Sequence, residues 1–246
     1  QVPLYYMMGQ QDNPYWVEAN GMKVHFRLAG DADPRDHLIE VTVREQCFAP
    51  DIPFLNYIRV KGLVCENAAT GAPVPQRGAI SAYRGHHWII EDCEISHSKC
   101  CGISLGKYRD PENDMYFYTK HVKSPTQMER DAVCRGQYHG WLKENIGSHI
   151  VRRNNIHHCE QGGIIGRMGA VFSIIEDNHI HHINNMQELG GAEISGIKLH
   201  AAIDVTMRRN HIHHCVMGIW TDWEAQGTRI TCNLLHDNQR PEYAAP

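Results

Sequence analysis

Short apolar runs rich in β-branched residues recur along the second half of this chain, and turn residues separate them. Three segments are nearly identical, at residues 154–159, 178–183 and 210–215, and the third residue of each is an isoleucine set among asparagine and histidine. The anchoring apolar residues are spaced by 24, 32 and 23 positions: Ile156, Ile180, Ile212 and Leu235. Repetition at this period predicts a solenoid, whose coils bury an apolar face only by stacking on each other.

A glycine-isoleucine pair follows Ile95, which opens the series, and each of the three anchoring isoleucines. The pairs are Gly102-Ile103, Gly163-Ile164, Gly196-Ile197 and Gly218-Ile219. About nine extra residues around 184–192 account for the long step between repeats. Each unit therefore has room for three short strands and an asparagine turn, but for neither the helix nor the leucine spacing of a leucine-rich horseshoe. The pattern predicts an all-β chain folded as a right-handed parallel β-helix.

The segments outside the repeat divide the chain into two parts. Residues 1–50 are expected to form the edge of the solenoid or of a neighbouring β domain, with a hairpin over 16–28 around Asn20-Gly21 and a further alternating strand at 37–44. Residues 51–246 form the β-helix, which begins with a coil strand near 56–63. An excursion at about 107–147 interrupts it, and Ser124-Pro125 followed by Gln127 predicts a helix start there. Both ends look cut, because no capping coil is visible.

Composition narrows the classes of function. The chain has 24 basic and 28 acidic side chains, a formal charge of −4, and no basic stripe, which argues against nucleic acid as a partner. No apolar run approaches the roughly 18 residues that span a bilayer, and no secretory signal opens the chain. Nine scattered cysteines without a CxxC motif favour buried free thiols over disulfides. We therefore expect a soluble protein of a reducing, cytoplasmic compartment.

Eighteen histidines suggest zinc at first sight, but the His-His pairs recur with the period of the fold. Adjacent side chains of a strand point to opposite faces. We therefore expect one histidine of each pair to stack in a ladder on its equivalents and the other to point the opposite way. Structural ladders are favoured over metal ligation, and neither a metal nor a cofactor is predicted.

Polar residues gather where the strands after the glycine-isoleucine pairs end. Two positions past each glycine stand Ser104, Ile165, Lys198 and Trp220, and four positions past stand Gly106, Arg167, His200 and Asp222. Residues two apart share a face, and neighbouring coils lie about 4.8 Å apart. Lys198, His200, Trp220 and Asp222 should therefore form one patch. Glu160 and Glu193, three positions before their glycines, approach the same edge, as do Gln161, Trp223 and Gln226.

Carboxylates flanked by indole rings suit a sugar, whose apolar face stacks on a ring while its hydroxyls bind the carboxylates. Two carboxyls about 5 Å apart would fit retaining hydrolysis, and about 6.5–9.5 Å inverting hydrolysis. Structural roles remain open for three of these residues. Asp222 could cap a turn, Glu193 could pair with Lys198, and Trp220 could pack inside the solenoid.

The segments that carry these residues, 191–204 and 218–229, resemble those of the glycoside hydrolase family 120 β-xylosidases. Residues 88–96, 98–106 and 144–147 are also similar, and the resemblance extends over about 16–238. It implies a parallel β-helix accompanied by a β-sandwich, and retaining exo-hydrolysis of β-1,4-xylo-oligosaccharides or aryl β-xylosides. It also implies that Asp222 is the nucleophile and that Glu193 and Lys198 bind the terminal sugar.

One departure concerns the general acid/base. The resemblance implies a glutamate on the next coil, in a Glu-Val string before His-Gly, but residues 239–246 do not match and Glu242 does not fit that string. We expect this residue to lie beyond Pro246.

The remaining groups are expected to bind substrate. Trp220 or Trp223 would stack on the sugar, and His200, Gln226, Glu160 and Gln161 would hold hydroxyls. The expected partner is a xylo-oligosaccharide or another β-glycoside, and homo-oligomers remain open. Two alternatives remain: a polysaccharide lyase with Lys198 or Arg167 as base and a calcium site, and a carbohydrate-binding solenoid without catalysis.

Overall fold

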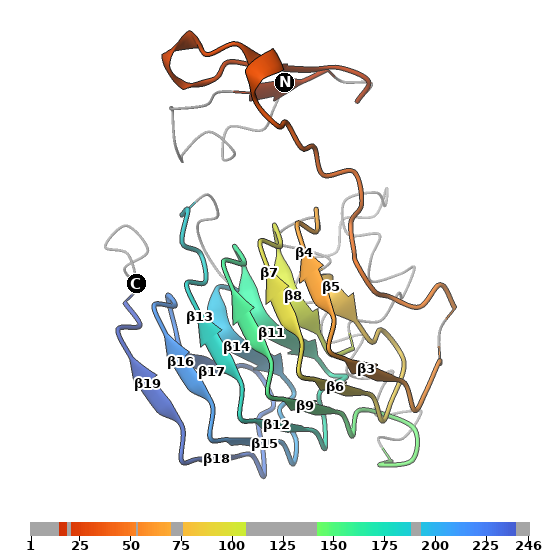
Figure 1. Ribbon diagram of the computed structural model, residues 1–246. Helices are drawn as coiled ribbons and strands as arrows, with labels where there is room; N and C mark the ends of the chain where they lie inside the picture. The colour runs from red at the N-terminus through yellow and green to blue at the C-terminus, as the bar shows by residue number, and fades with distance from the viewer. Residues whose placement is uncertain are drawn as a thin grey trace, which may run out of the picture.

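A computed structural model describes residues 15–18, 21–52, 54–69, 76–106, 142–187 and 193–239. Apart from an N-terminal hairpin, all of its named strands pair in parallel and form three sheets around one cylinder (Figure 1). The predicted class, an all-β parallel β-helix, is confirmed. The only helical turns in the described ranges are two three-residue 3₁₀ turns, Ala29–Asp31 and Pro34–Asp36. No helix in these ranges is long and apolar enough to cross a membrane.

Each of the first five coils contributes one strand to each sheet, and the last described coil contributes one strand to each of the first two sheets. The first sheet contains β3 (Arg59–Lys61), β6 (Ile89–Glu91), β9 (Ile150–Arg152), β12 (Ile174–Glu176), β15 (Thr206–Arg208) and β18 (Arg229–Thr231). The second contains β4 (Val64–Glu66), β7 (Glu94–Ser96), β10 (Asn155–His157), β13 (His179–His181), β16 (His211–His213) and β19 (Leu234–His236). The third contains β5 (Gly78–Ser81), β8 (Cys101–Ser104), β11 (Gly162–Arg167), β14 (Ser195–His200) and β17 (Ile219–Thr221).

The corner between the first and second sheets has the same construction in successive coils. A residue with positive φ, such as Asp177 (φ 57°) or Arg209 (φ 54°), turns the chain, and an asparagine then points inward. The Asn178 amide donates to the carbonyl of Val151 and to Oδ1 of Asn210, both at 3.0 Å. Asn154, Asn210 and Asn233 continue this asparagine ladder. Because each side chain bonds the coil on either side of it, the ladder fixes how the coils stack.

Apolar side chains fill the cylinder in register with the ladder. Ile156, Ile180 and Ile212 are paired position by position across β10, β13 and β16, and all are fully buried. The glycine of each glycine-isoleucine pair lies against this stack. A Cβ added to Gly196 would come within 2.7 Å of the Ile212 side chain and 2.8 Å of the Gly218 carbonyl oxygen. Glycine recurs there because the close approach of the third sheet leaves no room for a side chain.

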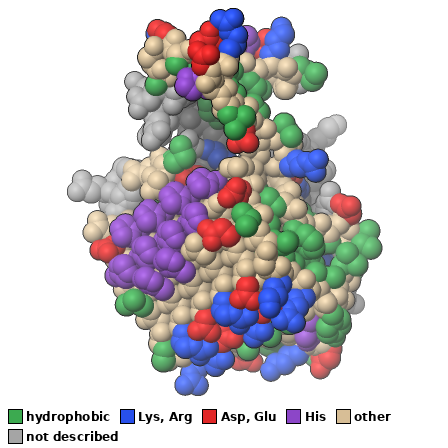
Figure 2. All heavy atoms as spheres, in the orientation of Figure 1, with side chains coloured by type: hydrophobic (Ala, Val, Ile, Leu, Met, Phe, Trp, Pro, Cys, Tyr) green, Lys and Arg blue, Asp and Glu red, His purple; other side chains and the backbone are tan. Residues whose placement is uncertain are grey.

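Histidine covers one outer face of the cylinder, over the second sheet (Figure 2). The rings form a strand-end column of His157, His181, His213 and His236, and a turn column of His97, His158, His182 and His214. The expected stacking is confirmed, but the expectation that the second histidine of each pair would point the opposite way is wrong. That histidine follows the strand with φ near 53°, and this left-handed conformation turns its side chain onto the same outer face.

The hairpin predicted near the N-terminus is confirmed, because β1 (Tyr15–Val17) pairs antiparallel with β2 (Val24–Phe26). The strand predicted at 37–44 is wrong, because these residues are exposed and pair with no strand in the part of the chain that the structure describes. The excursion at about 107–147 and its helix fall largely outside the described residues, as does much of the insertion around 184–192. The domain division at residue 50 stays a prediction, although Phe48 already bridges Ile80 of β5.

Cysteines occupy the interior as expected. All eight that the structure describes are free thiols, and six of them are buried. Cys159 and Cys215, at equivalent positions of their repeats, are fully or almost fully buried. Burial raises the pKa of each of these two thiols to about 12, so both stay protonated and act as small apolar groups.

Asn178→Ala should lower the free energy of unfolding by about 3 kcal/mol, because the buried Asn154 backbone N–H, the Val151 carbonyl and Oδ1 of Asn210 each lose a bond to its side chain. Urea denaturation followed by circular dichroism measures the change. Asn155→Ala is the matched control, because Asn155 bonds only Glu94 on the outer face and should cost about 1 kcal/mol. Equal losses in the two variants would contradict a special role for the ladder.

Candidate active site

Three consecutive strands of the third sheet bring the predicted site residues together. Ile165, Lys198 and Trp220 are paired across β11, β14 and β17, and Arg167 is paired with His200. The predicted register of the glycine-isoleucine repeats is therefore confirmed. Asp222 follows β17, where its backbone N–H donates to the Leu199 carbonyl at 2.8 Å. Glu193 precedes β14 with a φ of 78°.

Lys198 lies at the centre of a charged cluster with Glu193, His200 and Asp222. Its ammonium bonds the carboxylate of Glu193 and Nε2 of His200, and lies 3.1 Å from Oδ2 of Asp222. His200 Nε2 is 3.5 Å from each of the two carboxylates. The two acids thus share one site at the edge of the third sheet, and we call these four residues the Lys198 cluster.

The charged side chains of the Lys198 cluster are largely buried. The Lys198 side chain is fully buried, and those of Asp222 and Glu193 are 13% and 23% exposed. A buried ammonium is costly unless it is paired, and two carboxylates supply that pairing. The ligand atoms of Glu193, His200 and Asp222 lie within 4.8 Å of one another, a spacing that would suit a metal ion. The Lys198 ammonium already provides the positive charge between the two acids.

Glu193 is held ionised. Burial alone would raise its pKa, but hydrogen bonding to His200 and the positive charge of Lys198 outweigh burial and lower the pKa to about 2. A second side chain contributes to this geometry, because Gln76 donates from Nε2 to Glu193 Oε2 at 2.5 Å. At neutral pH, Glu193 can therefore accept hydrogen bonds but has no proton to give.

Asp222 is oriented by contacts at both of its oxygens. Oδ1 accepts a hydrogen bond of 2.8 Å from the backbone N–H of Trp223, while Oδ2 faces Lys198. The local bond is a turn-capping interaction, so the structural role left open by the sequence is real. This bond leaves Oδ2 available for a reaction, because it involves only Oδ1 and fixes the direction in which Oδ2 points.

Two indole rings border the cluster. Lys198 Nζ lies 4.9 Å from the centroid of the Trp220 ring, which is within cation–π range. Trp223 meets His200 edge to face at 5.7 Å and is 42% exposed. Trp220 is thus partly committed to Lys198, whereas Trp223 presents an accessible apolar surface beside Asp222.

The contacts seen for three further predicted site residues are with residues outside the Lys198 cluster. The Glu160 carboxylate accepts from the backbone N–H of Met186 at 3.3 Å and so anchors the turn after β13. The buried Gln161 accepts from the Cys100 thiol. The Gln226 side chain is exposed, and its backbone bridges Ile203. Their expected roles in binding sugar hydroxyls stay predictions.

Gln76 is the site residue that the sequence did not suggest. It belongs to a Gly/Pro-rich loop 117 residues before Glu193, outside the repeats. It has a positive φ of 55° and is 96% buried, since only 4% of its surface is exposed. Its Oε1 and Nδ1 of His200 are buried without hydrogen-bond partners in the described part of the chain. Such atoms beside the cluster suit hydroxyl groups of a ligand.

Comparison with known proteins agrees with this architecture. The model of the right-handed β-helix region family matches residues 78–243. The chain belongs to this family. A search of curated protein sequences gave no match.

Among solved structures, the complex of XylC with xylose is similar to this chain, with 43% sequence identity and a TM-score of 0.80. The match covers 87% of this chain and 34% of XylC, so the chain spans about a third of the length of that protein. The resemblance to glycoside hydrolase family 120 seen in the sequence is thereby confirmed.

The lowered pKa of Glu193 predicts an acid-dependent contribution to stability. A carboxyl whose folded pKa is about 2, against an ordinary 4.5, stabilises the fold above pH 4.5 and loses that contribution as the pH falls toward 2. The difference in unfolding free energy between wild type and Glu193→Gln should therefore shrink from pH 5 to pH 2, as measured by urea denaturation at each pH.

Glu160→Gln is the matched control with the opposite sign. Burial raises the pKa of Glu160, so the folded state takes up its proton first and gains stability as the pH falls. The free energy of unfolding of wild type, relative to that of Glu160→Gln, should therefore increase as the pH falls. The same trend in both variants would contradict the ionisation states argued for the two glutamates.

Proposed function

We propose that this protein is a retaining glycoside hydrolase that releases xylose from the non-reducing end of β-xylosides, with Asp222 as the nucleophile. One observation carries the proposal: the Asp222 carboxylate lies beside a buried lysine–glutamate pair in a β-helix that is 43% identical to a protein solved with xylose. The cluster has the residue types that attack and bind a sugar, and the similar protein was solved in complex with one.

Asp222 has the properties of a carboxylate nucleophile. Its Oδ1 is tied to the Trp223 backbone, and the positive charge of Lys198 lies near Oδ2. Attack at the anomeric carbon would form a glycosyl-enzyme ester and expel the aglycone, and water would then hydrolyse the ester. Fixing one oxygen removes rotational freedom of the carboxylate before attack, which favours reaction from the bound state.

Glu193 is unsuited to be the general acid. A glutamate with a pKa of about 2 is deprotonated at the pH where the fold operates and cannot protonate a leaving oxygen. We assign it to substrate binding, with Lys198, His200 and Gln76 beside it. The Lys198 cluster contains no third carboxylate, so the proposal assigns the acid/base to a residue outside the described part of the chain.

The sugar would be held by the groups around this pair. The exposed Trp223 offers an apolar surface for a pyranose face, and Gln76 Oε1 and His200 Nδ1 offer acceptor or donor positions for its hydroxyls. Lys198 would share its hydrogens between the two carboxylates and the sugar. Because all these groups converge on Asp222, the site favours a terminal residue whose anomeric carbon meets that carboxylate.

Two alternatives predict different products. A polysaccharide lyase would use Lys198 or Arg167 as its base, but Lys198 is already paired with two carboxylates. A non-catalytic carbohydrate-binding solenoid would use the same cluster to bind xylose without forming an ester. This second alternative needs no acid/base residue, so it is compatible with a cluster that contains only two carboxylates.

A 2,4-dinitrophenyl β-xyloside tests the nucleophile separately from the acid, because dinitrophenolate leaves without needing a proton. Wild type should release a burst of about one dinitrophenolate per site, followed by slower turnover. Asp222→Asn should slow the burst by more than about a thousandfold. Stopped-flow absorbance measures it, and mass spectrometry of a 2-fluoroxylosyl adduct should locate the ester on Asp222.

Asp177→Asn is the matched control, since Asp177 lies at the corner between the first and second sheets and pairs with Arg209. Its burst should equal that of wild type. Xylose binding by calorimetry without any burst in wild type would favour the binding solenoid. An unsaturated product from a polyuronate, lost on adding a chelator, would favour the lyase.

A further inference from the structure

Two histidines on the outer face of the second sheet do not belong to the repeating pairs. His179 and His211 are the first residues of β13 and β16 and are paired with each other. In neighbouring coils this position holds Glu94, Asn155 and Leu234. Stacking of the His-His pairs therefore does not explain why these two coils carry a third imidazole. We call His179 and His211 the strand-start pair.

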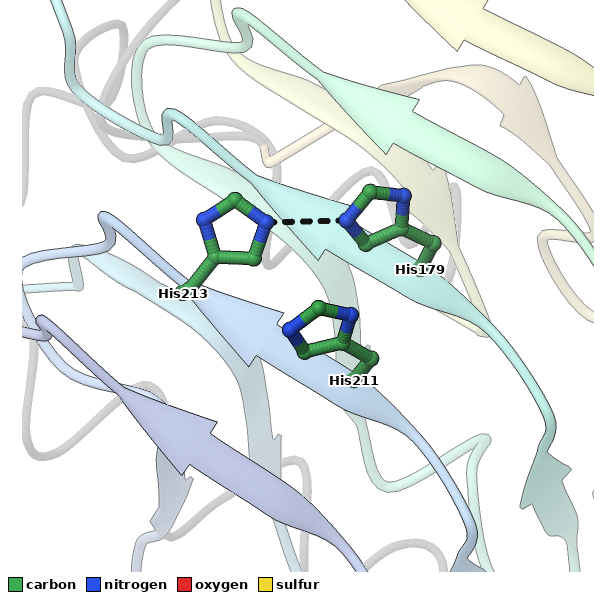
Figure 3. A group of neighbouring side chains, drawn as sticks. All are labelled: His179, His211 and His213. Carbon is green, nitrogen blue, oxygen red and sulfur yellow. Dashed lines mark hydrogen bonds between the residues drawn. The ribbon is translucent and has the colours of Figure 1, made fainter.

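The strand-start pair meets the strand-end column at His213. Figure 3 shows the rings of His179, His211 and His213 grouped over β13 and β16, with Nε2 of His179 facing Nε2 of His213 at 2.9 Å. Each of the three residues offers a nitrogen within 4.8 Å of the other two. Tetrahedral zinc with Zn–N bonds of about 2.0–2.1 Å needs ligand nitrogens roughly 3.3 Å apart. The His179–His213 separation is within a few tenths of an ångström of that value, and a nitrogen of His211 lies within 4.8 Å of both.

The remaining nitrogens suit ligation. Nδ1 of His213 is 2.7 Å from Nδ1 of His214, so a proton on His213 Nδ1 can be donated there and Nε2 keeps its lone pair. On the next coil, Nε2 of His236 lies 2.8 Å from Nε2 of His211, and its Nδ1 is 2.7 Å from Asp237 Oδ2. Histidine with its second nitrogen bonded to a carboxylate is the usual arrangement around a metal ligand.

Burial, followed by repulsion from the neighbouring imidazoles, disfavours a positive charge on His213 and His179, which lowers the pKa of both. All three residues are only partly exposed, so an ion would be shielded on one side by the sheet.

We propose that His179, His211 and His213 bind one divalent first-row transition-metal ion, with Zn²⁺ the representative case. Three imidazole nitrogens and an open fourth position, filled by water or by His236, form a set that such ions accept. The ion would bridge β13 and β16 and thereby fasten two successive coils together. The proposal departs from the expectation that histidine serves this surface only by stacking.

Titration of untagged, metal-free protein with Zn²⁺ by calorimetry tests the site. Wild type should show one saturable site, and His179→Gln, His211→Gln and His213→Gln should each weaken it by at least about tenfold. His158→Asn is the control, because it removes one imidazole of the turn column, and asparagine tolerates the positive φ of that position. It should change the affinity by less than about twofold.

Thermal unfolding provides a second measurement that does not depend on activity. Saturating Zn²⁺ should raise the Tm of wild type and of His158→Asn but leave that of His211→Gln unchanged, because an ion that binds only the folded state stabilises it. The proposal is overturned if wild type shows no saturable binding, if binding persists in the three Gln variants through the exposed thiols Cys47 and Cys232, or if His158→Asn weakens it equally.

Discussion

The buried asparagine ladder is the constraint on which the rest of the structure depends. Each asparagine bonds the backbone of the preceding coil and the side chain of the next, so a coil displaced by one residue would lose bonds on both sides. Such a slip would also move the isoleucine stack from the interior to the surface. No single coil buries an apolar face alone, so the stacking of the coils determines both their register and the stability of the fold.

The Lys198 cluster depends on that register. Lys198 and His200 come from β14, Asp222 follows β17, and Gln76 precedes β5, three sheet neighbours away. An ammonium buried between two carboxylates is stable only when both acids are in place, because removing one leaves a buried charge without its partner. The same pairing keeps Glu193 ionised, which suits it to bind substrate while Asp222 acts as the proposed nucleophile. The coil stacking therefore determines both which charges meet and what each of them can do.

Much of this was predictable from the sequence, for a physical reason. A solenoid repeats its local environment, so Gly163, Gly196 and Gly218 mark equivalent rungs, and simple counting places Lys198 beside Trp220. Counting fails where the environment does not repeat. Gln76 reaches Glu193 from a loop with no equivalent in other coils, and residues 37–44 alternate like a strand but have no neighbouring strand to bond. The turn histidines were misplaced because alternation holds only within a strand, and their positive φ ends it.

The outer histidine surface and the site are connected through the coils that they share. β13 and β14 belong to the coil that carries Lys198, and β16 and β17 to the coil that leads to Asp222. An ion held by the strand-start pair and His213 would therefore clamp the two coils whose relative position sets the 3.1 Å separation between Lys198 and Asp222. Stacked imidazoles resist sliding weakly, because neighbouring rings along a column are alike, whereas metal–nitrogen bonds fix both distance and direction. A repeat that already places histidines in line needs only one extra imidazole per coil to change from a stacked surface to a directional cross-link.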